Sequence, residues 1–340
     1  MSFKINVRGL QLPGAGRGGA LEALYEFESF DLPEQELFMP GHGLCGGCTI
    51  PVITRHMLKV LGPDTIVVNP TGCLEVSTVT YPRTNWAVPW IHVAFGNGGS
   101  VASGIEAAIK VLKRRGVIDP NRKINVVVVA GDGATADIGF QALSGMLERG
   151  HRVIYVMYDN EGYMNTGIQR SGTTPLFASA TTSPAGKKIP GNLTHKKPMA
   201  FIAAAHGIPY SATANPAYLA DMIQKFKKAA EVDGPSFLHI IQSCTPGWRF
   251  EPKYGIRVME LATETGFWVN YEIENGVFRI TTPVPKRKPI ECFLKLQGRF
   301  RHLTKEHIAI LQKVIDEDVK RLNEMAGGEF IGPVDPEAKC

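Results

Sequence analysis

Residues 124–133 read INVVVVAGDG, an uninterrupted apolar run that ends in Gly131, Asp132 and Gly133. A strand with one face in water alternates apolar and polar residues, and this run does not alternate. Such a run is typical of a strand that is buried on both faces, as in a parallel sheet covered by helices on both sides. The stretch therefore predicts a central strand of such a sheet, with a polar turn at its carboxyl end.

Comparable runs alternate with helical stretches on both sides of this segment. The sequence predicts further strands at 65–70, 153–160, 209–214 and 236–243, and helices at 50–61, 99–115, 137–150, 198–206 and 216–231. Asn215 and Pro216 supply an N-cap and a first-turn proline for the last of these helices. Alternation of this kind predicts an α/β fold with a doubly wound parallel sheet.

The two ends of the chain have a different pattern. After residue 250, the segment 267–280 predicts a hairpin that turns at Glu274, Asn275 and Gly276, and 304–326 predicts an amphipathic helix. We therefore expect an N-terminal extension at 1–37, a main domain at 38–250 and a C-terminal arm at 251–340 that consists of a hairpin and a helix.

Composition excludes several classes of protein. The 340 residues carry a net charge of +5, but their basic runs are short and scattered, so we expect no binding to nucleic acid. No apolar run reaches the roughly 18 residues that a membrane span requires, and the first residues do not resemble a signal peptide. We expect a cytoplasmic protein whose six cysteines stay reduced, which argues against a disulfide framework.

Polar residues follow two neighbouring strands of the predicted sheet. Asp132 ends one strand and Asn160 ends the next, 28 positions later. Ligands of open parallel sheets bind at this edge. A diphosphate bound through Mg²⁺ needs a carboxylate, neutral oxygen ligands and glycines that let the backbone approach the phosphates. Asp132, the Asn160 amide and a backbone carbonyl near Gly162 would supply such a magnesium site.

Four cysteines would reach the same edge. Cys45 and Cys48 precede the sheet, Cys73 follows its first strand and Cys244 follows its last. Four thiolates bind either Zn²⁺ or an iron–sulfur cluster, and a single close pair favours the cluster, since structural zinc usually takes two close pairs. A thioredoxin-like redox pair would need a strand before Cys45, and none is evident.

The remaining candidates are weaker. The segment 166–175, TGIQRSGTTP, contains hydroxyl groups and Arg170 within an irregular stretch that continues to about 197, so we expect an ordered active-site or interface loop. Cys292 and Cys340 are expected to have no partners. Structural roles are expected for four histidines, which are His42, His92, His206 and His239.

Taken together, these motifs resemble the thiamine diphosphate-binding β subunit of 2-oxoacid:ferredoxin oxidoreductases, in particular the pyruvate synthase branch. The resemblance extends from Pro40 to about residue 325. It depends on the segments PGHGLCGGC, NPTGCLEV, PWIHVAFGN, GDGATADIGFQALSG, YDNEGYMNTGIQRS, TTSPAGKK and LKLQGRFRHL, which occur in this order.

The resemblance implies specific roles for these residues. Cys45, Cys48, Cys73 and Cys244 would bind one [4Fe–4S] cluster, and Asp132, Asn160 and the backbone of Gly162 would bind Mg²⁺. Glycines would contact the diphosphate and thiazolium; the cofactor-binding set includes Gly72, Cys73, Gly131, Gly133 and Asn165. Asn165 would be the catalytic residue, near the reacting carbon and the substrate.

The resemblance also implies the reaction and the partners. Thiamine diphosphate would allow the decarboxylation of a 2-oxoacid, with pyruvate as the expected substrate. Coenzyme A would accept the acyl group, and the cluster would pass single electrons to ferredoxin. Only one α/β domain is evident. An α subunit should therefore supply the pyrimidine-binding domain, and γ- and δ-like subunits should supply ferredoxin-like clusters.

Three alternatives remain open. FGNGG at 95–99 departs from the family pattern, and Gly96 could make room for a bulkier, aromatic 2-oxoacid such as a phenylglyoxylate-like substrate. The chain could be a non-redox thiamine diphosphate lyase with structural zinc. It could also be a non-catalytic assembly subunit.

Overall fold

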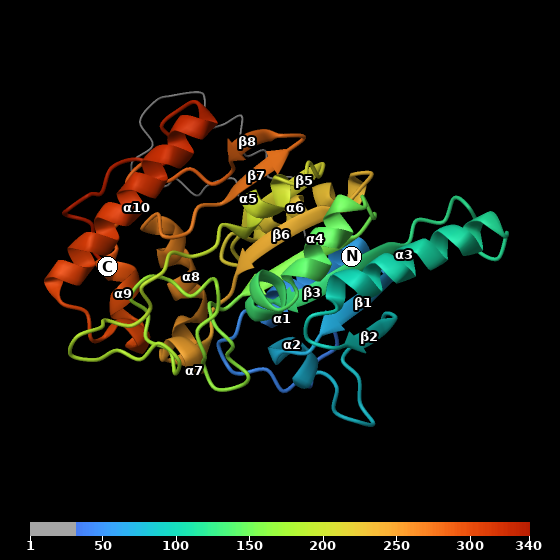
Figure 1. Ribbon diagram of the computed structural model, residues 1–340, viewed down its shortest axis with the longest axis horizontal. Coiled ribbons are helices and arrows are strands. Elements are labelled where there is room, and N and C mark those ends of the chain that lie inside the picture. Colours follow the sequence, from blue (N-terminus) through green and yellow to red (C-terminus); the bar gives the residue numbers. More distant parts are fainter. Residues whose placement is uncertain (1–31) are drawn as a thin grey trace.

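The computed structural model describes residues 32–340 and contains one eight-stranded, mostly parallel sheet (Figure 1). The strand order is β2-β1-β3-β4-β6-β5-β7-β8. The strands are β1 (Thr65–Pro70), β2 (Trp90–Val93), β3 (Asn125–Gly131), β4 (Ile154–Asp159), β5 (Tyr210–Ala214), β6 (Ser236–Ile241), β7 (Tyr271–Glu274) and β8 (Val277–Ile280). The first six strands in this order are parallel to one another.

The predicted strands are confirmed, and one further strand was missed. All residues of β4, β5 and β6 are buried, which explains their continuous apolar runs. The missed strand, β2, lies at the edge of the sheet and has only four residues, two of them exposed. A four-residue edge strand that is half exposed is too short to give a clear pattern in a sequence.

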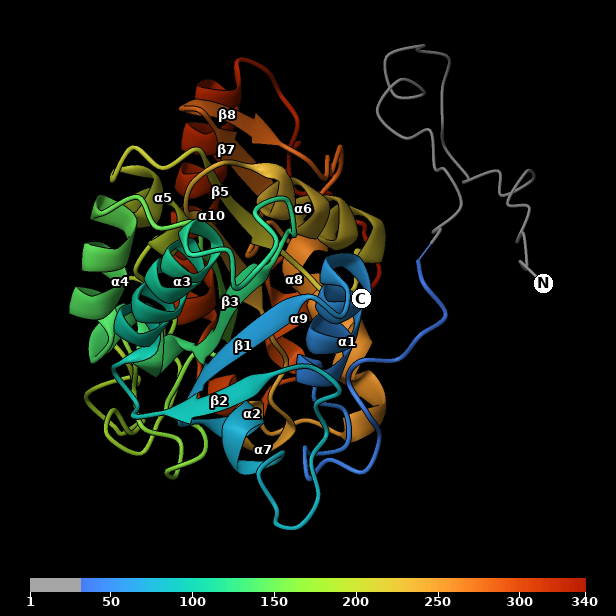
Figure 2. The ribbon, with the colours of Figure 1, turned by 90° about the vertical axis from the view of Figure 1, so that its right-hand side faces the viewer.

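Helices cover both faces of the sheet (Figure 2). The helices are α1 (Ile50–Leu61), α2 (Cys73–Val76), α3 (Gly98–Arg114), α4 (Phe140–Glu148), α5 (Met199–Ala204), α6 (Leu219–Glu231), α7 (Thr245–Trp248), α8 (Gly255–Glu264), α9 (Glu291–Lys295) and α10 (Lys305–Ala326). Alternate residues of β3 face opposite layers: Val127 packs with α1 and α6, whereas Val128 packs with α3, α4 and α5. The doubly wound α/β architecture is therefore confirmed.

The helix boundaries shift by a few residues from the predicted ones. α6 begins at Leu219 rather than at residue 216, because Asn215 Oδ1 accepts a hydrogen bond from the backbone N–H of Ala217 and holds a turn there. α4 begins at Phe140, because a wide π-helical turn at Gly133–Asp137 precedes it. That turn places Asp132 at the carboxyl end of β3.

The C-terminal segment extends the sheet. β7 and β8 form the expected hairpin, with Asn275 and Gly276 at positive φ in its turn, and β7 pairs antiparallel with β5. α8, α9 and α10 enclose a separate apolar core with this hairpin. Thr304 caps α10 through its side-chain oxygen. The hairpin and helix are thus confirmed, and the limits of the C-terminal arm at 251–340 stay a prediction.

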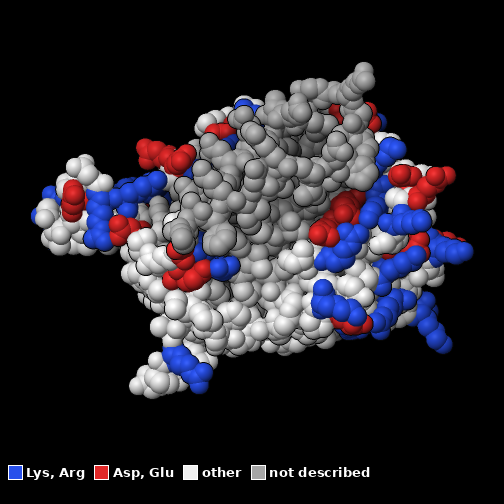
Figure 3. All heavy atoms as spheres, turned by 180° about the vertical axis from the view of Figure 1, so that it is seen from behind, with Lys and Arg blue, Asp and Glu red and all other residues white. Residues whose placement is uncertain are grey.

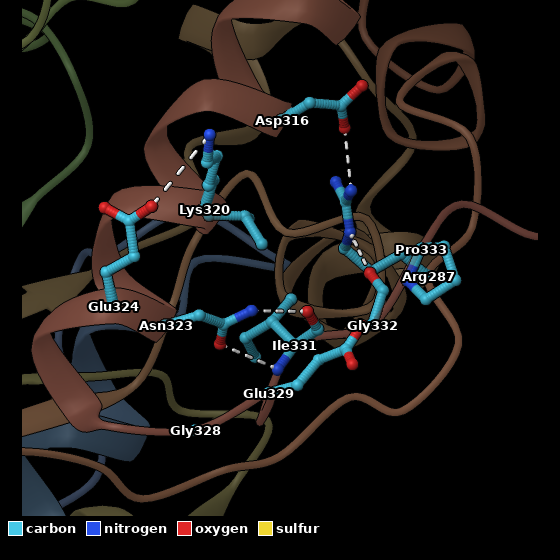
Figure 4. Close-up of a pocket in the computed structure, with 11 residues that line it drawn as sticks. Arg287, Asp316, Lys320, Asn323, Glu324, Gly328, Glu329, Ile331, Gly332 and Pro333 are labelled. Atoms are coloured by element: carbon cyan, nitrogen blue, oxygen red, sulfur yellow. Dashed lines mark hydrogen bonds and ion pairs between the residues drawn. The ribbon is translucent and has the colours of Figure 1, made fainter.

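Residues 328–333, which follow α10, are held against this helix (Figure 4). A pocket of about 430 Å³ lies between α10 and residues 328–333. Arg287 spans it, donating to the carbonyl of Gly332 at 2.8 Å and to Asp316 at 2.7 Å, and Asn323 donates to the carbonyl of Ile331. None of the predicted site residues lines this pocket.

One expectation about the cysteines was wrong. Cys292 on α9 and Cys340 at the C-terminus form a disulfide, with Cα atoms 5.0 Å apart. The argument from reducing conditions concerned cysteine chemistry in the cytosol and carried no information on which sulfurs the fold brings together. Cys45, Cys48, Cys73 and Cys244 are free thiols.

Charges on the described part of the surface are mixed. In the view from behind, Lys and Arg side chains stand beside Asp and Glu side chains (Figure 3). On α10, for example, Arg321 pairs with Asp318 and Lys320 with Glu324. No helix within residues 32–340 is both long enough and apolar enough to cross a membrane. Of the predicted extension at 1–37, residues 1–31 lie outside the described part of the chain.

Candidate functional site

A cavity of about 160 Å³ lies at the carboxyl ends of β1, β3 and β4, and we call it the strand-edge cavity. All eight residues predicted to bind the organic cofactor line it. These are Gly72, Cys73, Gly131, Asp132, Gly133, Asn160, Gly162 and Asn165. Residues separated by up to 93 positions thus meet at one edge, because parallel strands end on the same side of a sheet.

Asp132 is the buried carboxylate of this cavity. Its side chain is 1% exposed, and Oδ2 accepts hydrogen bonds from Ser171 at 2.5 Å and Thr173 at 3.0 Å. Burial, together with the nearby charge of Asp159, raises the pKa of Asp132 well above its usual value. A buried carboxylate without a compensating cation is a common mark of a functional site.

Asn160 and Gly162 face the other oxygen of Asp132. One amide atom of Asn160 lies 3.0 Å from Asp132 Oδ1 and 2.8 Å from the Gly162 carbonyl oxygen. If that atom is nitrogen, Asn160 donates to both oxygens. If it is oxygen, three acceptors converge with no donor between them, and a cation is needed to hold them together. The three predicted magnesium ligands are therefore adjacent.

Glycines allow close packing around the cavity. A Cβ on Gly72 would lie 2.8 Å from the Tyr158 hydroxyl, and a Cβ on Gly133 would overlap the ring of Tyr163. The Tyr163 hydroxyl in turn donates to Asp137 at 2.8 Å. The glycines at these positions thus keep two tyrosine rings in the cavity wall.

A second cavity of about 430 Å³ contains all four predicted cluster cysteines, and we call it the cysteine cavity. Cys45 and Cys48 come from the turn before α1, Cys73 from the start of α2 and Cys244 from the end of the segment after β6. The two cavities share part of their walls. The shared residues are Cys73, Asn160, Met164 and Asn165.

Donors surround the sulfur atoms. Backbone N–H groups of Ile50, Asn165 and Gly247 point to Cys48, Cys73 and Cys244, respectively. Gln242 Nε2 also donates to Cys48 Sγ at 3.3 Å.

Burial, reinforced by the neighbouring thiols, raises the pKa of Cys73 and of Cys244 to about 12. The Cys73 and Cys244 thiols are therefore protonated at neutral pH, and a metal must displace their protons to bind. Among residues 32–340, no three His, Cys, Asp or Glu side chains already form a site for a single metal ion.

A buried network of charges lies behind the strand-edge cavity, and the sequence analysis missed it. Asp159 pairs with Lys196 at 2.8 Å, and Glu161 pairs with Lys196 and with Arg299, both at 2.6 Å. His239 also contacts Asp159, at 2.7 Å. Glu161 itself has a positive φ of 66°, so the turn between Asn160 and Gly162 is held in an uncommon conformation. The polar residues at the ends of strands β4 and β6 were the only signal in the sequence that could have indicated this network.

The long loop after β4 wraps around the site. Ser171 and Thr173 within it contact Asp132, and Thr173 also donates to Asp159 at 2.8 Å. Arg170 points away from these contacts and donates to Asn192 and Thr194. The predicted loop is therefore ordered against the site, and its hydroxyl groups rather than Arg170 contact the candidate ligands.

The histidines and Gly96 have other neighbours. His92 bonds to Thr71, His206 to Ser144 and His239 to Asp159. His42 stacks on Phe38. A Cβ on Gly96 would lie 3.1 Å from the carbonyl oxygen of Ile138, and Gly96 does not line either cavity, whereas the adjacent Phe95 lines the strand-edge cavity.

Several known proteins are similar to this chain in sequence. Residues 70–240 match the family model described as "Thiamine pyrophosphate enzyme, C-terminal TPP binding domain". The chain is 56% identical over 290 residues to "Pyruvate synthase subunit PorB" of Methanocaldococcus jannaschii. The aligned region covers 85% of this chain and 97% of that protein. It is 46% identical over 297 residues to "Ketoisovalerate oxidoreductase subunit VorB" of Pyrococcus abyssi, covering 87% of this chain and 95% of that protein.

A solved structure shares the fold. It is a 2-oxoglutarate:ferredoxin oxidoreductase from Magnetococcus marinus, with a TM-score of 0.51 and 20% sequence identity, covering 69% of this chain and 82% of that one. The fold and site thus define a thiamine diphosphate-binding enzyme subunit. More specifically, the chain belongs to the family of β subunits of 2-oxoacid:ferredoxin oxidoreductases, and it functions with other subunits in a multi-subunit enzyme.

Proposed function

We propose that this chain is the catalytic β subunit of a pyruvate:ferredoxin oxidoreductase, and that it binds thiamine diphosphate, Mg²⁺ and one [4Fe–4S] cluster. The observation that carries the proposal is the shared wall of the strand-edge and cysteine cavities, formed by Cys73, Asn160, Met164 and Asn165. An organic cofactor in the first cavity and a cluster in the second would be separated only by these side chains.

We assign the cation to the three converging oxygens. Asp132 Oδ1, the Asn160 amide oxygen and the Gly162 carbonyl would bind Mg²⁺, while Ser171 and Thr173 hold the other carboxylate oxygen of Asp132 in place. Hard oxygen ligands of this kind suit Mg²⁺. The backbone at Gly72, Gly131 and Gly133 would contact the diphosphate and thiazolium, since no side chain at these positions blocks the approach.

We assign the cluster to Cys45, Cys48, Cys73 and Cys244. The fit is supported by their common cavity and by the backbone donors to three of the sulfurs, because such hydrogen bonds stabilise cluster thiolates. A one-electron carrier next to the organic cofactor is what an enzyme needs when its acceptor, ferredoxin, takes electrons singly.

Thiamine diphosphate, when bound, supplies the nucleophilic carbon and the electron sink that decarboxylation requires. In the overall reaction, pyruvate and coenzyme A yield acetyl-CoA, CO₂, one proton and two electrons, and the electrons leave singly for ferredoxin. Because Asn165 lines both cavities, we assign to its amide the role of orienting the substrate carboxylate or keto group.

Pyruvate is the proposed substrate because three pyruvate synthase subunits, at 52–56% identity, are more similar to this chain than the ketoisovalerate subunits at 46%, although three further pyruvate synthase subunits are only 45–47% identical. A Cβ at position 96 would meet the backbone of Ile138, and Gly96 does not line the strand-edge cavity, so its position offers no support for an aromatic substrate. We further propose a cytoplasmic complex in which an α subunit supplies the pyrimidine-binding domain and γ- and δ-like subunits carry electrons onward.

The test is turnover of the complex, purified without oxygen, with coenzyme A and ferredoxin. The substrates are pyruvate, 2-oxoisovalerate, 2-oxoglutarate and phenylglyoxylate. We expect the highest kcat/KM with pyruvate and a brown protein that dithionite bleaches. A preference for phenylglyoxylate would instead support the aromatic alternative, and a colourless zinc protein would support the lyase.

A further inference from the structure

Gln242 lies between the two proposed cofactor sites and has no role in the assignments above. It follows β6 directly, its side chain is 1% exposed, and it lines the cysteine cavity. A buried amide needs partners for both of its ends. The two ends of the Gln242 amide face two different sites.

The two ends are within hydrogen-bond distance of Cys48 and Asn160. Gln242 Nε2 donates to Cys48 Sγ at 3.3 Å, and it also contacts the carbonyl oxygen of Ser243. Gln242 Oε1 lies 3.2 Å from the amide of Asn160. The opposite end of the Asn160 amide is the atom that faces Asp132 Oδ1 and Gly162 O.

A cation would fix the orientation of both amides. It requires the oxygen of Asn160 to face Asp132 and Gly162, because a cation cannot bind an amide nitrogen that carries protons. The nitrogen of Asn160 then faces Gln242 Oε1 and donates to it. That contact acts together with the contact between Gln242 Nε2 and the Ser243 carbonyl oxygen to hold the nitrogen toward Cys48, where it donates to the sulfur.

We propose that Gln242 is a positioning residue that couples occupation of the cation site to the hydrogen bond on Cys48. The inference rests on the proposed function, since it assumes the cluster and the Mg²⁺–thiamine diphosphate complex. A hydrogen bond to a ligand sulfur favours the more negative, reduced state of a cluster and raises its reduction potential. Binding of Mg²⁺ and thiamine diphosphate would thereby make this cluster a better electron acceptor.

The experiment is a redox titration of the anaerobic complex, followed by electron paramagnetic resonance, with and without Mg²⁺ and thiamine diphosphate. Signals of clusters on other subunits are identified as those that persist in a Cys73→Ser complex. We expect the midpoint potential of this cluster to rise when Mg²⁺ and thiamine diphosphate bind to the unmodified complex. In Gln242→Leu we expect a lower potential, no such rise, and Mg²⁺ affinity reduced by about 10-fold.

A second variant separates the two hydrogen bonds. Gln242→Glu keeps an acceptor for Asn160 and loses the donor to Cys48, so we expect a lower potential with Mg²⁺ affinity closer to that of the unmodified complex. If Gln242→Leu does not assemble, Gln242→Glu alone decides. Gln224→Leu, at an exposed position of α6, is the control and should change neither quantity.

The possible failures can be distinguished. A potential that is the same in Gln242→Glu as in the unmodified complex would overturn the inference and leave the proposed function intact. A potential that does not respond to Mg²⁺ and thiamine diphosphate in the unmodified complex would also overturn it. A complex whose cluster signals are all unaffected by Cys73→Ser would overturn the proposed function itself.

Discussion

Glu161 and Arg299 are 138 positions apart in the sequence, yet their side chains form a buried ion pair with Oε2 and Nη2 2.6 Å apart. The guanidinium of Arg299 also lies over the ring of Trp248, at 4.0 Å, and Trp248 Nε1 donates to the carbonyl oxygen of Asn160. The C-terminal segment therefore supports the turn that carries Asn160 and Gly162.

Removing Arg299 should destabilise this turn. In Arg299→Met the Glu161 carboxylate keeps Lys196 and loses its second cationic partner inside the protein, a change that typically costs about 3–5 kcal/mol. We expect a lower thermal midpoint and weaker binding of thiamine diphosphate, measured by calorimetry on the complex. Arg301→Met, at an exposed position, should have an effect of about 0.5 kcal/mol or less. Equal midpoints for the two variants would contradict this role of Arg299.

Asp132→Asn should have opposite effects on stability without and with the cofactor. Burial and Asp159 disfavour the charge on Asp132, so the neutral variant should be at least as stable as the unmodified protein in EDTA. It should bind Mg²⁺ and thiamine diphosphate at least about 100-fold more weakly, and it should lose the thermal stabilisation that they provide. Thermal unfolding with and without both ligands measures the two effects. Unchanged turnover of the complex would favour the non-catalytic alternative.

Gly133→Ala should disrupt the wall of the strand-edge cavity. Its Cβ would overlap the ring of Tyr163, so the ring must move and its hydrogen bond to Asp137 is strained, at a cost of about 1–3 kcal/mol. Thiamine diphosphate affinity should fall as well. The control is Gly104→Ala within α3, where a Cβ meets no atom within 4 Å and should stabilise the helix by about 0.5–1 kcal/mol. Calorimetry and cofactor titration measure both variants, and stabilisation by Gly133→Ala would contradict the packing argument.

Replacing a cluster cysteine should separate electron transfer from cofactor binding. Cys73→Ser or Cys244→Ser should reduce the iron content and lower the rate of ferredoxin reduction far more than the affinity for thiamine diphosphate. Cys292→Ser removes a sulfur that pairs with Cys340 instead and should leave the iron content unchanged. Iron analysis and cofactor titration of the three complexes measure these effects. Equal losses of both functions would mean that the cysteines mainly hold the fold together.

Much of the fold could be predicted because burial leaves a clear pattern in a parallel sheet. The run at 124–133 is apolar throughout because β3 lies between β1 and β4 and has helices on both faces. β2 gave no such signal, since half of this short edge strand is exposed. The sequence also could not reveal that β7 pairs with β5, because strand pairing depends on contacts between distant segments.

The site was predictable where the carboxyl ends of parallel strands meet at one edge of the sheet. Asp132, Asn160, Cys73 and Cys244 follow this rule and meet as expected, and Cys45 and Cys48 reach the same edge from the turn before α1. Arg299 and Lys196 could not be recognised, because they come from segments whose position depends on tertiary packing. The disulfide between Cys292 and Cys340 was missed for the same reason.

The most direct test is a structure of the anaerobic complex with bound thiamine diphosphate, determined with anomalous scattering at the iron edge. The account predicts iron peaks inside the cavity lined by Cys45, Cys48, Cys73 and Cys244. It also predicts a magnesium-bound diphosphate against Asp132 and Asn160. Iron bound elsewhere in the subunit, or a diphosphate remote from Asp132, would contradict it.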